Sequence, residues 1–73
     1  MLEKFREYCQ FEYNSLKNVK DRNYDWFELD INKDNTIQRM MGAGQFLYLL
    51  GSKVDAKEVE TIYYEYVEKV RAL

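Results

Sequence analysis

Apolar residues recur every three or four positions in three separate segments of a chain that contains no proline. This spacing places them along one side of an α-helix. No repeat, linker or low-complexity run divides the chain, so residues 1–73 are expected to form a single small domain. The pattern predicts helices over residues 2–20, 36–50 and 56–72. We therefore expect an all-α fold, a three-helix bundle with an irregular acidic connection between its first two helices.

The first and third segments have well-defined apolar faces. Residues 2–20 place on one face Leu2, Phe5, Cys9, Tyr13 and Leu16. The third segment, 56–72, and the residue after it place on one face Val59, Ile62, Tyr63, Tyr66, Val70 and Leu73. Asp55 is expected to cap the third helix, because Glu58 follows three positions later and completes a capping box. Phe11 and Tyr64 fall outside both faces, so we interpret them as exposed rim residues or as parts of a binding surface.

The middle segment, 36–50, carries no charged residue between Met40 and Ser52. Its apolar residues spread over an arc of about 220° at 100° per residue, which is wider than one packing face requires. The segment is shorter than the roughly 20 apolar residues that cross a bilayer, so no membrane span is expected. This helix is therefore either covered on both sides within the bundle or covered in part by a second chain.

Gly42, Ala43 and Gly44 stand inside the predicted middle helix, where two glycines cost about 1–2 kcal/mol of helix propensity relative to alanine. A close helix crossing would offset that loss, and a helix broken at the glycines is the alternative. If a second chain covers this region, the interface candidates are Phe11, Gly42, Phe46, Leu49, Leu50 and Tyr64.

The acidic connection contains a run of oxygen-bearing residues at every second position: Asp30, Asn32, Asp34 and Thr36. This run resembles the start of an EF-hand calcium loop, which would cover residues 30–41, and the resemblance makes these four residues weak candidates for metal ligands. Two positions depart from the EF-hand pattern. Asn35 replaces the turn glycine, and Met41 replaces the bidentate glutamate.

A second interpretation of the same run involves no metal. Asp34 or Asn35 would cap the middle helix, with a side-chain oxygen accepting hydrogen bonds from its first backbone N–H groups. Trp26 and Phe27 would then close the core from the side of the connection. Under this interpretation we expect no bound metal and no cofactor.

Few residues could catalyse a reaction or crosslink the fold through a disulfide or a metal ion. Cys9 is the only cysteine and the chain has no histidine, so an intrachain disulfide and a structural zinc site are both excluded. Cys9 lies on an apolar helix face without a base, and we interpret it as a packed core thiol. We therefore expect that the protein is not an enzyme. Because no signal peptide is evident and the cysteine is single, a cytoplasmic location is expected.

These observations favour a small non-enzymatic protein-interaction factor with an accessory, regulatory or inhibitory role. We expect it to form a homodimer or larger homo-oligomer through the middle helix and to bind a further protein whose identity the sequence does not give. The excess of residues encoded by AT-rich codons suggests a small bacterial or phage protein. The alternatives are a degenerate EF-hand-like calcium module and a nucleic-acid-binding protein, although a net charge of −2 makes nucleic acid an unfavourable partner.

Overall fold

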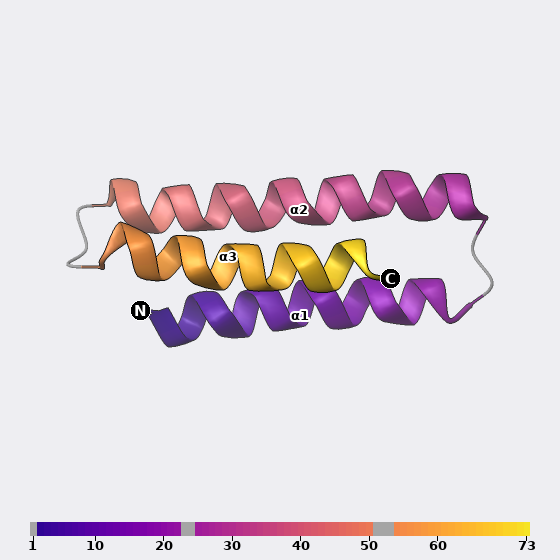
Figure 1. Cartoon of the computed structure of the whole chain (residues 1–73), viewed down its shortest axis with the longest axis horizontal. Helices are drawn as coiled ribbons and strands as arrows, with labels where there is room; N and C mark the ends of the chain where they lie inside the picture. Colours follow the sequence, from indigo (N-terminus) through magenta and orange to yellow (C-terminus); the bar gives the residue numbers. More distant parts are fainter. Residues whose placement is uncertain (1, 23–24, 51–53) are drawn as a thin grey trace.

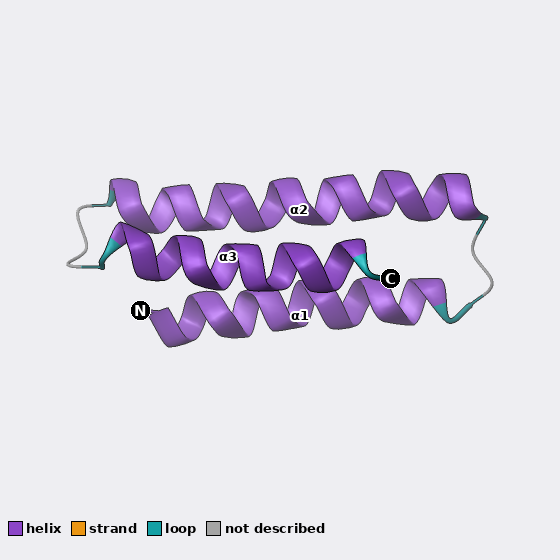
Figure 2. Ribbon diagram, viewed as in Figure 1, coloured by secondary structure: helices purple, strands orange, loops and turns teal. Residues whose placement is uncertain are grey.

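A computed structural model describes residues 2–22, 25–50 and 54–73 of the chain. These residues form α1 (Leu2–Lys20), α2 (Trp26–Leu49) and α3 (Ala56–Arg71). Successive helices run in opposite directions, so α2 lies antiparallel to both of its neighbours (Figure 1). Each helix packs against the other two. The described residues contain no strand, and their short loop segments lie at the ends of the helices (Figure 2). The predicted all-α three-helix bundle is confirmed.

The start of the second helix differs from the prediction. Helix α2 begins at Trp26 instead of residue 36, so the predicted irregular acidic connection is wrong for most of its length. Asp25 caps the helix, and its side-chain oxygen accepts a hydrogen bond from the backbone nitrogen of Phe27 at 3.4 Å. Asp34 and Asn35, which were predicted as caps, lie inside the helix.

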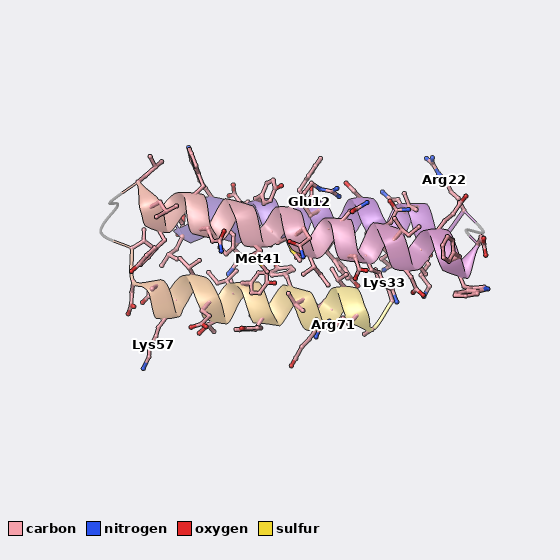
Figure 3. The ribbon with its side chains drawn as sticks, turned by 90° about the horizontal axis from the view of Figure 1, so that it is seen from above. Glu12, Arg22, Lys33, Met41, Lys57 and Arg71 are labelled. Atoms are coloured by element: carbon pink, nitrogen blue, oxygen red, sulfur yellow. The ribbon has the colours of Figure 1, made fainter. Side chains whose placement is uncertain are left out.

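Packing explains why this polar stretch is helical although Asp and Asn are weak helix formers. Leu29 and Ile37 continue the inward face of α2 toward its start, and both are packed in or against the core. Lys33 lies between them, half-buried, and its Nζ donates to the carbonyl of Arg71 at 3.5 Å, at the end of α3 (Figure 3). A lysine that covers a helix C-terminus in this way keeps its charge in a favourable position.

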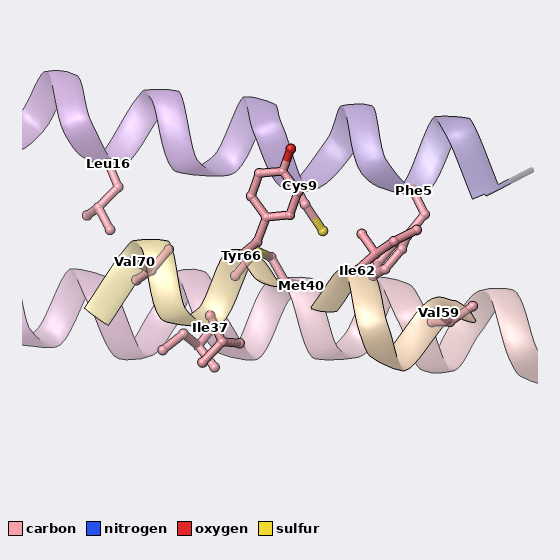
Figure 4. Packing of buried hydrophobic residues seen from close by; sticks show 10 residues of the cluster. Phe5, Cys9, Leu16, Ile37, Met40, Val59, Ile62, Tyr66 and Val70 are labelled. Carbon is pink, nitrogen blue, oxygen red and sulfur yellow. The ribbon is translucent and has the colours of Figure 1, made fainter. Parts of the chain in front are cut away.

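All three helices contribute to the hydrophobic core (Figure 4). Its buried members are Phe5, Cys9, Leu16, Ile37, Met40, Val59, Ile62, Tyr66, Val67 and Val70. The predicted apolar faces of the first and third helices are confirmed, and Val67 is an addition that the prediction missed. The Tyr66 ring is buried, and its hydroxyl donates to Gln10 Oε1 at 2.7 Å, so the polar end of the side chain is paired.

Helix α2 runs without a break through its two glycines, so the alternative of a broken helix is wrong. At Gly44 an added Cβ would lie 3.1 Å from Val59 Cγ1 and 3.3 Å from a Phe5 ring carbon. The predicted close crossing is therefore confirmed at Gly44. Gly42 is different, because it is exposed and an added Cβ would meet nothing within 4 Å.

Replacing Gly44 with Leu is expected to destabilise the protein by about 1–3 kcal/mol, because the larger side chain must displace its neighbours in a packed core. Urea denaturation of dilute protein would measure the loss. Gly42→Ala is the control, and it should leave the free energy of unfolding unchanged or raise it by up to about 1 kcal/mol. Equal stability of Gly44→Leu and the parent chain would contradict the close crossing.

Candidate functional site

Most of the exposed apolar surface belongs to one helix. Among the described residues, ten large hydrophobic side chains are exposed, and all but two of them lie on α2 or directly after it. Those on or after α2 are Trp26, Phe27, Ile31, Met41, Phe46, Tyr48, Leu49 and Leu50. The most exposed is Leu49, at 78%. Such a concentration on one element is typical of an interaction surface, whereas scattered exposed residues need no explanation.

One line of residues on the side of α2 that faces away from the bundle carries no charge. At 100° per residue its members fall within an arc of about 80°, and every one of them is exposed. We call this line the outer stripe of α2: Phe27, Ile31, Asn35, Gln38, Gly42, Gln45 and Leu49. Apolar residues occupy its two ends, and amide side chains and a glycine occupy its middle. An exposed helix face normally carries charged residues, so their absence here calls for an explanation.

The first turn of α2 extends past the end of α3 (Figure 1). Two aromatic residues in this overhang are exposed. Trp26 is 72% and Phe27 57% exposed. Their rings contact each other edge to face, with centroids 6.0 Å apart. The prediction that they close the core is therefore wrong, because no part of α3 reaches far enough to cover them.

The six predicted interface residues are all exposed. Gly42, Phe46 and Leu49 follow one another at four and three residues and share the outward side of α2. Leu50 lies directly after the helix, whereas Phe11 is on α1 and Tyr64 is on α3. The structure thus brings three of the six together, and contact of any of them with a partner stays a prediction.

A shallow groove of about 390 Å³ separates α2 from α3 on one side of the bundle. Met41 (Figure 3) and Tyr48 line it from α2, and Tyr63 and Tyr64 line it from α3. The two α3 rings meet edge to face with centroids 5.1 Å apart, and partial burial raises the pKa of Tyr63. Tyr64 therefore belongs to this groove and not to the outer stripe of α2.

The predicted calcium loop does not form. Its candidate ligands, Asp30, Asn32, Asp34 and Thr36, all lie within α2. Side chains two residues apart on a helix point about 200° apart, so successive members of the run face opposite sides. Thr36 is buried, and its hydroxyl accepts a hydrogen bond from Arg39 Nη2 at 3.2 Å. Within residues 2–22, 25–50 and 54–73, no group of three or more Asp, Glu, Cys or His side chains is placed to hold a metal ion.

Cys9 is completely buried in the core, as predicted. Burial is the main cause that raises the pKa of its thiol to about 11, from an ordinary value of 9.0. A buried thiol with a raised pKa is a poor nucleophile, because the thiolate is the reactive form.

Stability is expected to fall between pH 9 and pH 11 through Cys9. Below pH 9 the thiol is protonated in both the folded and the unfolded chain. Between pH 9 and pH 11 the thiol loses its proton in the unfolded chain but keeps it in the folded chain, and this difference favours unfolding. Above pH 11 the thiol is deprotonated in both states, so the loss of stability stops growing. The difference in free energy of unfolding between the parent and Cys9→Ala should shrink by about 1–3 kcal/mol across this range. Urea denaturation at several pH values would test this, and a constant difference would contradict it.

A partly buried ion pair joins α1 to α2, and no pattern in the sequence indicates it. Arg39 Nε donates to Glu12 Oε2 at 2.7 Å, and Glu12 is only 8% exposed. Burial, and then the Glu12 carboxylate, raises the pKa of the nearby Tyr8. A second ion pair, between Arg6 and Glu65 at 2.8 Å, links α1 to α3 at the surface. These two contacts link α1 to each of the other helices.

No helix in the described part of the chain combines the length and hydropathy that a bilayer-spanning segment needs. Helix α2 is the longest at 24 residues, but charged side chains interrupt its first half. Comparison of the chain with models of protein families, with curated proteins and with solved structures returned no match.

Proposed function

We propose that this protein is a non-enzymatic protein-interaction factor that self-associates through the outer stripe of α2. One observation carries the proposal: most of the exposed large hydrophobic side chains described in the structure lie on or next to a single helix. Apolar side chains gathered on one helix gain free energy when a partner removes them from water, and three of them, Phe27, Ile31 and Leu49, lie on the outer stripe.

A second copy of the chain fits this surface for two reasons. The outer stripe of α2 has no charge, so another uncharged stripe can face it without leaving a charged group buried and unpaired. A domain of this length also buries a smaller fraction of its surface than a larger domain does, and small folds often gain stability from a partner subunit.

The chemistry of the remaining residues supports a binding role over a catalytic one. The single thiol is buried, and its pKa is raised to about 11. Glu65 pairs with Arg6 on the surface, and Glu12 pairs with Arg39 beside the core, so these carboxylates hold helices together. An accessory or regulatory role in the cytoplasm of a bacterium or its phage stays a prediction.

Leu49→Lys is expected to convert the self-associated protein into a monomer. Leu49 is 78% exposed, so the substitution should change the stability of the single chain by no more than about 0.5 kcal/mol. Size-exclusion chromatography with light scattering would measure the mass at protein concentrations on the order of 100 μM.

Asn18→Lys is the matched control, because it adds the same charge on the exposed side of α1. It should leave the mass of the assembly unchanged. A parent chain that is monomeric at every concentration would contradict the proposal, and so would equal masses for Leu49→Lys and Asn18→Lys.

A further inference from the structure

We propose that the groove between α2 and α3 is a binding site for a small organic ammonium ion whose nitrogen carries methyl groups. The groove lies beside the outer stripe of α2, and among its described lining residues only Gln45 belongs to both. The site does not depend on self-association, so it can be tested separately from the proposed function.

Helical spacing places the groove residues on two facing walls. Residues three, four or seven positions apart share one side of a helix. At this spacing the walls consist of Met41, Gln45 and Tyr48 on α2 and Glu60, Tyr63 and Tyr64 on α3. Gly44 and Val59 also line the groove, and both are buried, so they form its floor. An ion in the groove is therefore flanked by side chains of both helices.

The charge of the groove favours a cation. Glu60 is the one charged residue among its described lining residues, and neither ion pair of the described chain involves it. Lys57, one turn earlier on α3, lines a different groove, between α1 and α3. The last turn of α2, which includes Tyr48, holds no basic residue, so the negative end of its helix dipole is uncompensated, whereas Asp55 offsets the positive end of α3.

The tyrosine rings of the groove are also free of cations from the chain itself. Within residues 2–22, 25–50 and 54–73, the one cation over a ring is Lys69, whose Nζ lies 4.7 Å from the centre of the buried Tyr66 ring. Arg71 lowers the pKa of Tyr63, but burial raises it more, and Arg71 does not line the groove. The Tyr63 and Tyr64 rings contact each other, whereas no described ring contacts that of Tyr48. The space between the two walls therefore stays open.

These features fit a methylated ammonium ion better than a metal ion or a lysine side chain. Aromatic rings attract such a cation through their electron-rich faces. A single carboxylate does not supply the oxygen shell that calcium requires. Methyl groups suit apolar neighbours such as Met41 and Val59, whereas the ammonium group of lysine is strongly hydrated. A volume of about 390 Å³ is at the lower end for small-molecule sites, so the occupant is a free ion of about the size of choline.

An NMR titration of dilute, isotope-labelled protein with choline chloride tests the site, with sodium chloride added to keep the ionic strength constant. The matched ligand control is the neutral carbon analogue of choline, in which a tert-butyl group replaces the trimethylammonium group. The test variants are Tyr64→Leu and Glu60→Gln, both at exposed positions. Their controls are Tyr64→Phe, which keeps the ring, and Glu7→Gln, which removes the same charge from the exposed side of α1.

We expect saturable shifts in the tyrosine ring signals of the groove and an affinity for choline at least about fivefold above that for the neutral analogue. Tyr64→Leu and Glu60→Gln should each weaken choline binding about two- to fivefold, while Tyr64→Phe and Glu7→Gln should stay within about twofold of the parent.

Shifts that do not saturate would overturn the site, and so would equal affinity for choline and its neutral analogue, because the groove would then be only apolar. Equal losses for Glu60→Gln and Glu7→Gln would also overturn it, since the ion would then respond to the overall charge of the chain. A peptide with trimethyl-lysine that binds at least about tenfold more tightly than choline would overturn the assignment to a free ion. Choline binding by a monomeric parent would support this inference and contradict only the proposed self-association.

Discussion

Met40→Ala is expected to destabilise the protein by about 2–5 kcal/mol, which is the usual cost of removing most of a buried side chain and leaving a cavity. Met40 is 0% exposed and lies at the middle of α2, where α1 and α3 meet it (Figure 4). A flexible side chain at this point fills the space between three helices, and alanine cannot reach the atoms that methionine contacts. Urea denaturation at a fixed protein concentration would measure the loss, since self-association makes stability depend on concentration.

Met41→Ala is the matched control, because it removes the same atoms from the next residue of the same helix. Met41 is 36% exposed at the edge of the groove between α2 and α3, so its removal should cost less than about 1 kcal/mol. Equal losses for the two variants would mean that α2 is rotated about its axis relative to the structure. Such a rotation would also move the outer stripe of α2, and the proposed function would then lose its basis.

The two helix starts show how much of the fold the sequence could predict. Asp55 and Glu58 form a capping-box pattern, and the predicted start of the third helix is confirmed. Asp25 and Glu28 have the same spacing, and Asp25 caps α2 in the same way. This second pattern was missed because Asp and Asn dominate the residues that follow, and these residues favour turns when no tertiary contact opposes them.

The wrong start predicted for the second helix also limited the prediction of the candidate site. Gly42, Phe46 and Leu49 were predicted as interface residues because they lie in the charge-free half, and their exposure is confirmed. Phe27 and Ile31 were missed because the acidic half was assigned to a connection. Because residues 26–35 are helical, Phe27 and Ile31 fall at helical spacing on the same side of α2 as Gly42 and Leu49, and so belong to the outer stripe. The capping-box pattern of Asp25 and Glu28 was the signal that could have found them.

The ion pair between Glu12 and Arg39 belongs to a different class of feature. Its partners are 27 residues apart, and their contact depends on which sides of α1 and α2 face each other. Periodicity places each residue on its own helix but does not set the rotation of one helix against another. A glutamate beside an apolar face therefore predicts nothing definite until the packing is known.

Arg39→Met is expected to destabilise the protein by about 2–3 kcal/mol, because the Glu12 carboxylate stays buried and loses its charged partner. Glu12 has only 11% of its side chain exposed, whereas the Arg39 side chain is 53% exposed, which keeps the expected loss below that of a fully buried pair. Methionine preserves the apolar contacts of the arginine stem, so the measured loss reports mainly on the charge. Urea denaturation at pH 7 and fixed protein concentration would measure it.

Arg6→Met is the control, because it breaks the ion pair with Glu65, whose side chains are 49% and 40% exposed. Its cost should be about 0–1 kcal/mol, since water replaces the lost partner. Glu12→Leu added to Arg39→Met should recover most of the lost stability, because the double variant no longer buries an unpaired carboxylate. If Arg39→Met costs no more than Arg6→Met, Glu12 is hydrated in solution, and α1 and α2 pack less closely along this edge than the structure shows.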